Sequence, residues 1–215
     1  MDRTAIKEQV IKNGVVAVIR IKDADVLMKV IEAIRAGGIK SIEITTTVPN
    51  AIGMIEITKR EFGDSIILGV GTVLNAQTAK EAIEAGSEFV VSPVLKKEIV
   101  ETTHQMQKAV FPGAFSPTEA LYAHELGADI IKIFPADIVG MAFFKAIKAP
   151  MPQLDLMPTG GVSLDNAGDW LKAGACAVGI GGALLDKQAI SEKRFQVLTD
   201  NAKRVIANIE KARNN

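Results

Sequence analysis

Short apolar runs rich in β-branched residues recur along the chain, separated by stretches in which apolar residues follow a helical spacing. Eight runs have the length and composition of buried strands: residues 15–20, 42–46, 66–70, 89–92, 109–112, 130–134, 154–158 and 177–180. Between them lie segments rich in helix formers, such as 24–36, 76–85 and 117–126, and a last helix is expected over 192–213. The alternation predicts an α/β protein, a single (β/α)8 TIM barrel with short loops.

Several predicted helices have recognisable ends. Ser116, Pro117 and Glu119 supply an N-cap, a proline at the first helical position and a capping glutamate. Asn75 and Ser163 are N-cap candidates for two other helices. A doubly wound open sheet is the alternative architecture, because spacing alone does not prove that a sheet closes. No linker or charge run marks a second domain, so one barrel domain is expected over residues 1–215.

Composition narrows the classes of function. The net charge is zero and charged residues make up 23%, so no basic surface argues for nucleic acid or for an anionic membrane. The first eight residues mix both charges and lack the apolar core of a signal peptide, and the uncharged stretch 173–185 is too short to span a bilayer. The one cysteine, Cys176, excludes an intramolecular disulfide. A cytoplasmic protein is expected.

Lys132 is the one charged residue in the apolar run 130–134. A primary amine inside such a strand is costly to desolvate, so it is rarely there for packing. Burial lowers the pKa of a lysine and leaves part of the amine neutral, which is the condition for Schiff-base formation with a carbonyl substrate. The alternative is a lysine that reaches the sheet edge or pairs with a carboxylate.

Polar residues also occur in the predicted strand 42–46 and just after it. Alternation places Glu43, Thr45 and Thr47 on one face of this strand. A carboxylate in so apolar a setting keeps a raised pKa and is suited to proton transfer. The alternative for Glu43 is an ion pair with Lys132 or Arg20, which is compatible with catalysis.

Two glycine-rich strand ends predict a phosphate site. Strand seven is followed by Thr159, Gly160 and Gly161, and strand eight by Gly181 and Gly182. Glycines expose backbone N–H groups at the place where barrels commonly bind phosphate, although glycines also serve tight turns.

Three further side chains complete the candidate site. Arg20 ends the first strand and Thr72 follows the third, and both are suited to holding a carboxylate or phosphate, although Arg20 could equally be a surface residue. Phe134 lies two residues after Lys132 on the same face and can keep the amine dry. His104 and His124 fall in predicted helices without neighbours at ligand spacing, so no metal is expected.

Six motifs together resemble the KDPG/KHG aldolase family (2-keto-3-deoxy-6-phosphogluconate and 4-hydroxy-2-oxoglutarate aldolases). They are Glu43-Ile44-Thr45, Gly69-Val70-Gly71-Thr72-Val73-Leu74, Ser92-Pro93, Phe111-Pro112-Gly113, Ile131-Lys132-Ile133-Phe134-Pro135 and Pro158-Thr159-Gly160-Gly161-Val162. The resemblance implies a metal-independent, cofactor-free class I aldolase, usually a homotrimer. Its substrate would be a phosphorylated 2-keto-3-deoxy sugar acid, cleaved to pyruvate and glyceraldehyde 3-phosphate. Cleavage of 4-hydroxy-2-oxoglutarate and use of the 6-phosphogalactonate analogue are also within its scope.

The resemblance assigns roles by position. Lys132 matches the Schiff-base lysine and Glu43 the proton-transferring glutamate. The substrate-binding residues it implies, taken with the face and loop arguments above, are Arg20, Thr45, Thr47, Thr72, Pro93, Phe134, Thr159, Gly160, Gly161, Gly181 and Gly182. Two positions depart from much of the family: Thr47 stands where an arginine is common, and Gly182 where a serine is common.

Two other classes of function remain open on the residues alone. A phosphate-binding (β/α)8 isomerase or synthase would use Glu43 for acid–base chemistry and Lys132 only as a cation. A catalytically silent barrel would bind a sugar phosphate or serve as an oligomer scaffold. A covalent imine at Lys132 discriminates the aldolase from both.

Overall fold

The computed structural model describes residues 1–214, so Asn215, the last residue of the expected domain, lies outside the described part. The strands are β1 (Val15–Ile19), β2 (Ser41–Thr45), β3 (Ile67–Gly71), β4 (Phe89–Val91), β5 (Ala109–Phe111), β6 (Gly113–Ala114), β7 (Ile131–Ile133), β8 (Leu156–Pro158) and β9 (Val178–Ile180). The helices are α1 (Arg3–Asn13), α2 (Ala24–Ala36), α3 (Ala51–Phe62), α4 (Ala76–Glu84), α5 (Lys97–Gln105), α6 (Pro117–Glu125), α7 (Ala136–Lys148), α8 (Ala167–Lys172), α9 (Lys187–Ser191) and α10 (Gln196–Arg213), with a short 3₁₀ turn at Gly63–Ser65.

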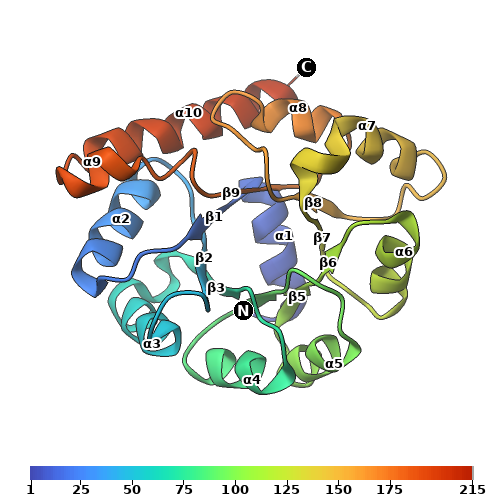
Figure 1. The fold of residues 1–215 in the computed structure, drawn as a ribbon, viewed down its shortest axis with the longest axis horizontal. Coiled ribbons are helices and arrows are strands. Elements are labelled where there is room, and N and C mark those ends of the chain that lie inside the picture. The colour runs from blue at the N-terminus through green and yellow to red at the C-terminus, as the bar shows by residue number, and fades with distance from the viewer. Residues whose placement is uncertain (215) are drawn as a thin grey trace.

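All paired strands are parallel, and helices surround them (Figure 1). One sheet has the order β5-β4-β3-β2-β1-β9 and the other β6-β7-β8. Only Pro112 separates β5 from β6, and its carbonyl still accepts a hydrogen bond from the Lys132 N–H at 2.9 Å. Bridges at Leu156–Ala175 and Thr159–Gly179 join the β8 and β9 segments. The predicted α/β barrel architecture is therefore confirmed, although its hydrogen-bonded ladder is divided into two sheets.

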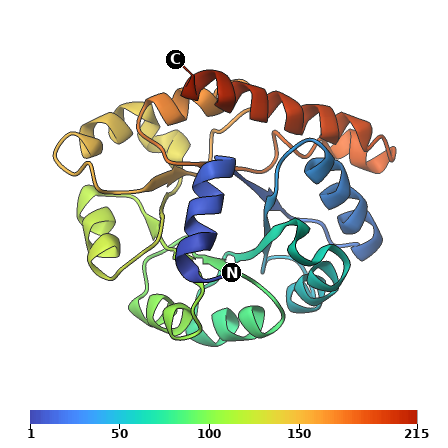
Figure 2. The same ribbon diagram turned by 180° about the vertical axis from the view of Figure 1, so that it is seen from behind.

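Helix α1 was not anticipated from the sequence. It lies across the amino-terminal side of the strands (Figure 2), where Ile6 and Val10 are fully buried. Asp2 caps its start by accepting from the Ala5 N–H, and Arg3 Nε donates to Asp129 Oδ1 at 2.6 Å. With only two buried positions in eleven residues, α1 carries little amphipathic signal of its own.

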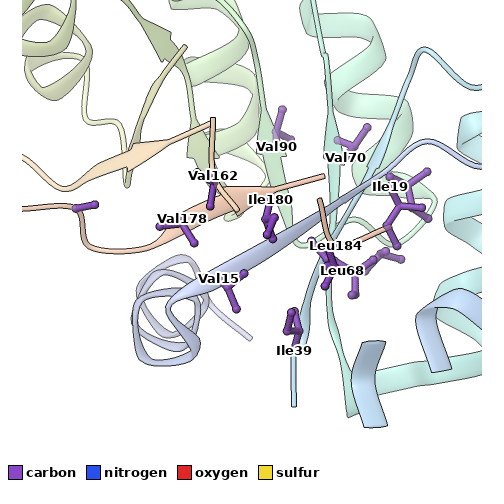
Figure 3. Packing of buried hydrophobic residues seen from close by; sticks show 14 of the residues in the cluster. Val15, Ile19, Ile39, Leu68, Val70, Val90, Val162, Val178, Ile180 and Leu184 are labelled. Atoms are coloured by element: carbon purple, nitrogen blue, oxygen red, sulfur yellow. The ribbon is translucent and has the colours of Figure 1, made fainter. Parts of the chain in front are cut away.

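Two apolar cores follow from the alternation of each strand. Residues facing the helices, such as Val15, Val178 and Ile180, form the larger core (Figure 3). Residues at the alternate strand positions point to the other face of the sheet. They include Phe89 and Phe111 and form a second core with α1. Those two rings stack with centroids 5.1 Å apart. The second core fills the interior of the barrel at the end that α1 covers.

Two of the three predicted N-caps are confirmed. Ser116 and Glu119 form the full capping box, and Asn75 accepts from the Thr78 N–H at 2.8 Å. The prediction that Ser163 is an N-cap is wrong, because α8 begins at Ala167. Ser163 instead accepts from the Asn166 N–H at 3.2 Å in the turn before the helix.

The predicted terminal helix is also shorter than expected. Its first residues, from position 192, belong to a turn between α9 and α10, in which Lys193 has φ 56°. This left-handed conformation interrupts a helix, so α10 begins at Gln196. The strand predicted over 154–158 similarly begins only at Leu156. Within residues 1–214, no helix is long and apolar enough to cross a membrane.

Candidate active site

Strand alternation aims two ionisable side chains into the barrel interior. In β2, Ile42 and Ile44 belong to the outer core, so Glu43 between them faces inward. In β7, Ile131 and Ile133 likewise belong to the outer core, so Lys132 between them faces inward. Only 1% of Glu43 and 3% of Lys132 is exposed. The structure thus places the two charged residues singled out from the sequence inside one barrel.

The shared interior changes the pKa values of both groups. Burial raises the pKa of Glu43, and the positive charges of Lys132 and Arg20 oppose this rise only in part. Burial lowers the pKa of Lys132, the negative charge of Glu43 opposes the fall, and Arg20 adds to it. The amine therefore becomes neutral at a lower pH than an exposed lysine, as a nucleophile requires. Glu43 remains protonated to a higher pH than an exposed glutamate.

Glu43 is not held by an ion pair. Among residues 1–214 it forms no salt bridge, and its buried Oε1 has no hydrogen-bond partner within the protein. The ion-pair alternative for Glu43 is therefore wrong in this structure. Buried polar atoms are nearly always satisfied, so an unpaired carboxylate oxygen inside a barrel is typical of a functional group.

Gly71 makes room for that carboxylate, and sequence reasoning missed this role. β3 pairs with β2 so that Gly71 lies opposite Thr45, and a Cβ at Gly71 would overlap Glu43 Oε1. Two residues earlier, a Cβ at Gly69 would overlap the ring of Phe89. Both positions require glycine, one for a reactive group and the other for a packed ring.

The aromatic neighbour of Lys132 lies where strand parity predicts. The amine Nζ is 5.1 Å from the centroid of the Phe134 ring, which itself is 38% exposed. Phe134 thus covers the amine on one side and faces the barrel mouth on the other. Such a contact excludes water from the nitrogen while its other side remains accessible to a substrate.

Threonines at the ends of β2 and β3 form a hydroxyl cluster. Thr45 Oγ1 and Thr47 Oγ1 are 2.8 Å apart, and Thr46 Oγ1 donates to the Thr72 carbonyl at 2.8 Å. Thr47 itself is exposed. Thr72 has φ 61°, a strained conformation for a β-branched residue, and such strain concentrates at functional sites. The sequence did not indicate that Thr46 fixes Thr72.

A cavity of about 280 Å³ lies at the barrel mouth beyond Lys132. Its lining brings together predicted site residues from four separate segments: Arg20, Phe134, Thr159, Gly160, Gly161, Gly181 and Gly182. Gly160 and Gly161 have φ 101° and 71°, which side-chain-bearing residues rarely adopt. The glycine loops predicted from the sequence therefore converge on one cavity together with an arginine.

One neighbour of this cavity, Asp137, was not predicted, whereas Pro93 was predicted but is not among the residues that line the cavity. The carboxylate of Asp137, at the start of α7, lies so near that a Cβ at Gly160 would be 2.8 Å from its Oδ1. Pro93 is partly buried and follows β4, and its carbonyl would be overlapped by a Cβ at Gly113. Pro93 thus packs against the strand beside Lys132, and its contact with substrate stays a prediction.

Comparison with known proteins is consistent with this geometry. The model of the family "KDPG and KHG aldolase" matches residues 6–200. A 2-dehydro-3-deoxy-phosphogluconate aldolase of Pseudoalteromonas atlantica is 31% identical over 194 residues, 90% of each chain. A 2-dehydro-3-deoxy-6-phosphogalactonate aldolase of Escherichia coli is 29% identical, over 80% of this chain and 85% of its own.

A solved structure has nearly the same fold. The KDPG aldolase of Legionella pneumophila, with pyruvate captured at low pH as a covalent carbinolamine intermediate, superposes with a TM-score of 0.85 at 28% identity. The match covers 94% of this chain and 97% of that one.

Proposed function

Because the chain belongs to the KDPG and KHG aldolase family, we propose that it cleaves a 2-keto-3-deoxy-6-phospho sugar acid through an imine at Lys132. The preferred substrate is 2-keto-3-deoxy-6-phosphogluconate, and the products are pyruvate and glyceraldehyde 3-phosphate. One observation carries the proposal: a buried amine with a lowered pKa shares the barrel interior with an unpaired carboxylate. A non-covalent isomerase would use the carboxylate but does not need a neutral amine, and a silent barrel needs neither feature.

Lys132 performs the covalent steps. Its neutral amine adds to the C2 carbonyl to give a carbinolamine, and loss of water gives an iminium. The positive charge of the iminium accepts the electron pair of the C3–C4 bond as that bond breaks. The buried surroundings favour the neutral amine at the start. The captured carbinolamine of the Legionella pneumophila enzyme supports this order of events.

Glu43 moves the proton. As a carboxylate, directly or through a water molecule, it takes the proton of the C4 hydroxyl while the C3–C4 bond breaks, and the aldehyde departs. The enamine that remains takes a proton at C3, and hydrolysis releases pyruvate and the free amine. The unpaired Oε1 of Glu43 leaves one oxygen available for this work.

The ends of the substrate are held by the two groups of residues at the mouth. We assign the pyruvate carboxylate to the hydroxyls of the threonine cluster, with Thr72 held in place through Thr46. The glycine loops after β8 and β9 receive the phosphate, with Arg20 beside them. Among the candidate binding residues, Pro93 has no role in these assignments.

A substrate panel tests the proposal. Purified protein is assayed with the 6-phosphogluconate and 6-phosphogalactonate derived keto acids, with both lacking phosphate, and with 4-hydroxy-2-oxoglutarate. We expect the highest kcat/KM with the gluconate-derived phosphate ester. The galactonate-derived ester is the alternative, since relatives carry both names. Absence of pyruvate release from all five would contradict the proposal.

We further propose that the protein is a cytoplasmic homotrimer. Large apolar side chains are exposed on segments that follow consecutive strands: Leu74 at 50%, Val94 at 42%, Phe115 at 45% and Ile138 at 70%. Copies of the same chain would cover them. Sedimentation should give three times the chain mass, and Ile138→Glu should shift the mass towards the monomer. Cell fractionation tests the location.

A further inference from the structure

A second cavity adjoins the one at the barrel mouth. Its volume is about 580 Å³, and it lies between the segment after β1 and helix α9. The two cavities share Val18, Arg20 and Gly182 in their linings. A volume of this size is typical of small-molecule sites.

The walls of the second cavity are chiefly aliphatic. Ile21, Leu185 and Ile190 provide the aliphatic surface. The cationic side chains of Arg20 and Lys187 also line the space, and no carboxylate of residues 1–214 does. Ser191, also in the lining, donates its hydroxyl to the Gln188 carbonyl at 2.8 Å and so needs no ligand partner. The cavity therefore differs in kind from its neighbour, whose lining is rich in glycine backbone. Its walls are suited to removing an apolar group from water.

The two cavities meet at Gly182, which is exposed and lines both. A Cβ at this position would meet no atom of the described chain within 4 Å. Val18 lies in register with Glu43 on the adjacent strand, which places this boundary near the reacting carbons. A substrate joined to Lys132 thus has two directions for its aldehyde half, one towards the glycine loops and one towards aliphatic walls.

We propose that the second cavity is a subsite for an apolar aldehyde half. The protein would then also cleave unphosphorylated 4-hydroxy-2-oxo acids that carry an alkyl or aryl group on C4. The proposal rests on the proposed aldolase function and uses its chemistry unchanged. Glu43 takes the C4 hydroxyl proton and the C3–C4 bond breaks. The electron pair of that bond converts the iminium into an enamine. The apolar aldehyde leaves, and protonation at C3 with hydrolysis yields pyruvate.

A chain-length series on the wild-type protein is the first test. The substrates are 4-hydroxy-2-oxo acids with progressively longer unbranched alkyl groups. We expect kcat/KM to rise by roughly fourfold per added methylene until the cavity is filled, as burial of a CH₂ group predicts. A flat series overturns the proposal, as does no cleavage of any member by protein that cleaves the phosphorylated acid.

A filling variant is the second test. Ser191 is exposed at the end of α9, so Ser191→Phe can project into the cavity without disturbing the core. It should lower kcat/KM for the longest effective alkyl substrate about fifteenfold, the loss expected when roughly two methylenes stay in water. It should leave the phosphorylated acid unaffected, and Ser191→Ala should change neither.

Equal losses on both substrates with Ser191→Phe, or no loss on either, would overturn the subsite. Borohydride trapping of pyruvate separates this failure from failure of the aldolase itself. If trapping succeeds and alkyl substrates fail, only the second cavity was assigned wrongly. If trapping fails, the aldolase function and the subsite fall together.

Discussion

The two ends of the barrel interior are built by the same strands, yet they hold opposite kinds of side chain. At the end covered by α1, stacked aromatic rings and aliphatic residues pack against one another. The other end holds the buried Lys132 amine and the Glu43 carboxyl group, and at its mouth Arg20, Phe134 and glycine loops line a cavity of about 280 Å³. The first arrangement stabilises the fold, and the second leaves polar groups partly unsatisfied for chemistry.

β3 shows the contrast within three residues. A Cβ at Gly69 would overlap the Phe89 ring, and a Cβ at Gly71 would overlap the Glu43 carboxylate. Both glycines leave out a Cβ for the same steric reason, although the neighbour that benefits differs. A residue type alone therefore does not tell which end of the interior it serves, whereas its contact does.

The largest effect should come from replacing Lys132 at the active end, with replacement of Lys7 at the other end as the control. Lys132→Met keeps the length of the side chain but removes the nucleophile, so cleavage should fall by at least on the order of 10⁴-fold. Lys7→Met in α1 removes only a salt bridge to Asp155 and should leave kcat and KM unchanged. Steady-state assays of pyruvate release compare the two. Substantial turnover by Lys132→Met would contradict a covalent mechanism at Lys132.

The next effect concerns the proton carrier. Glu43→Gln should lower kcat by roughly 10²–10⁴-fold, the usual range for loss of a general base. Because burial raises the pKa of Glu43, the active carboxylate is lost at a higher pH on acidification than for an exposed glutamate. The acid limb of the pH–kcat profile should therefore be displaced upward in the wild type and absent in Glu43→Gln. An unchanged limb would assign the proton to another group.

The two glycines of β3 provide a paired test. Gly71→Ala should displace the Glu43 carboxylate and reduce cleavage by about 10²-fold, while borohydride trapping of pyruvate is retained better than cleavage. Gly69→Ala should instead lower the free energy of unfolding by roughly 1–3 kcal/mol through overpacking against Phe89. Kinetics and denaturant unfolding are measured on both. If the two variants changed cleavage and the free energy of unfolding to the same extent, the two ends would not be functionally distinct.

The smallest effects belong to the anion site at the mouth. With Thr47 exposed and Gly182 without a hydroxyl, Arg20 should carry much of the binding of the substrate's anionic groups. Arg20→Ala should raise KM by about tenfold, as expected for one charge-assisted contact. Gly182→Ser should raise the ratio of kcat/KM for the phosphorylated substrate to kcat/KM for the unphosphorylated one. If Arg20→Ala is silent, the exposed Arg20 side chain does not bind the substrate. An unchanged substrate preference in Gly182→Ser would place the phosphate elsewhere.

Local patterns were enough to predict the strands and the residues that share a face with Glu43 and with Lys132. Side chains alternate along a strand, which is why the sequence alone places Glu43 with Thr45 and Thr47 on one face, and Lys132 with Phe134 on one face. Helix caps that depend on neighbouring residues, such as Ser116 with Glu119, were equally readable. These features depend on residues only a few positions apart.

What the sequence did not show depends on contacts between distant segments. The clearance between Gly71 and Glu43 arises across two strands, and the tie from Thr46 to Thr72 spans two loops. Helix α1 is stabilised by the barrel it covers rather than by its own pattern. Cys176 illustrates the same limit, because burial and, to a smaller extent, the negative charge of Asp155 raise the pKa of its thiol to about 12.

The most direct test of the active end is to trap its covalent intermediate. Protein is incubated with pyruvate and borohydride, digested with trypsin and analysed by mass spectrometry, with EDTA added in a parallel activity assay. A modified Lys132 resists cleavage, so the reduced adduct should appear on a single peptide covering residues 109–145, with loss of activity and no effect of EDTA. An adduct on another lysine, or activity that requires a divalent metal, would contradict the assignment of Lys132.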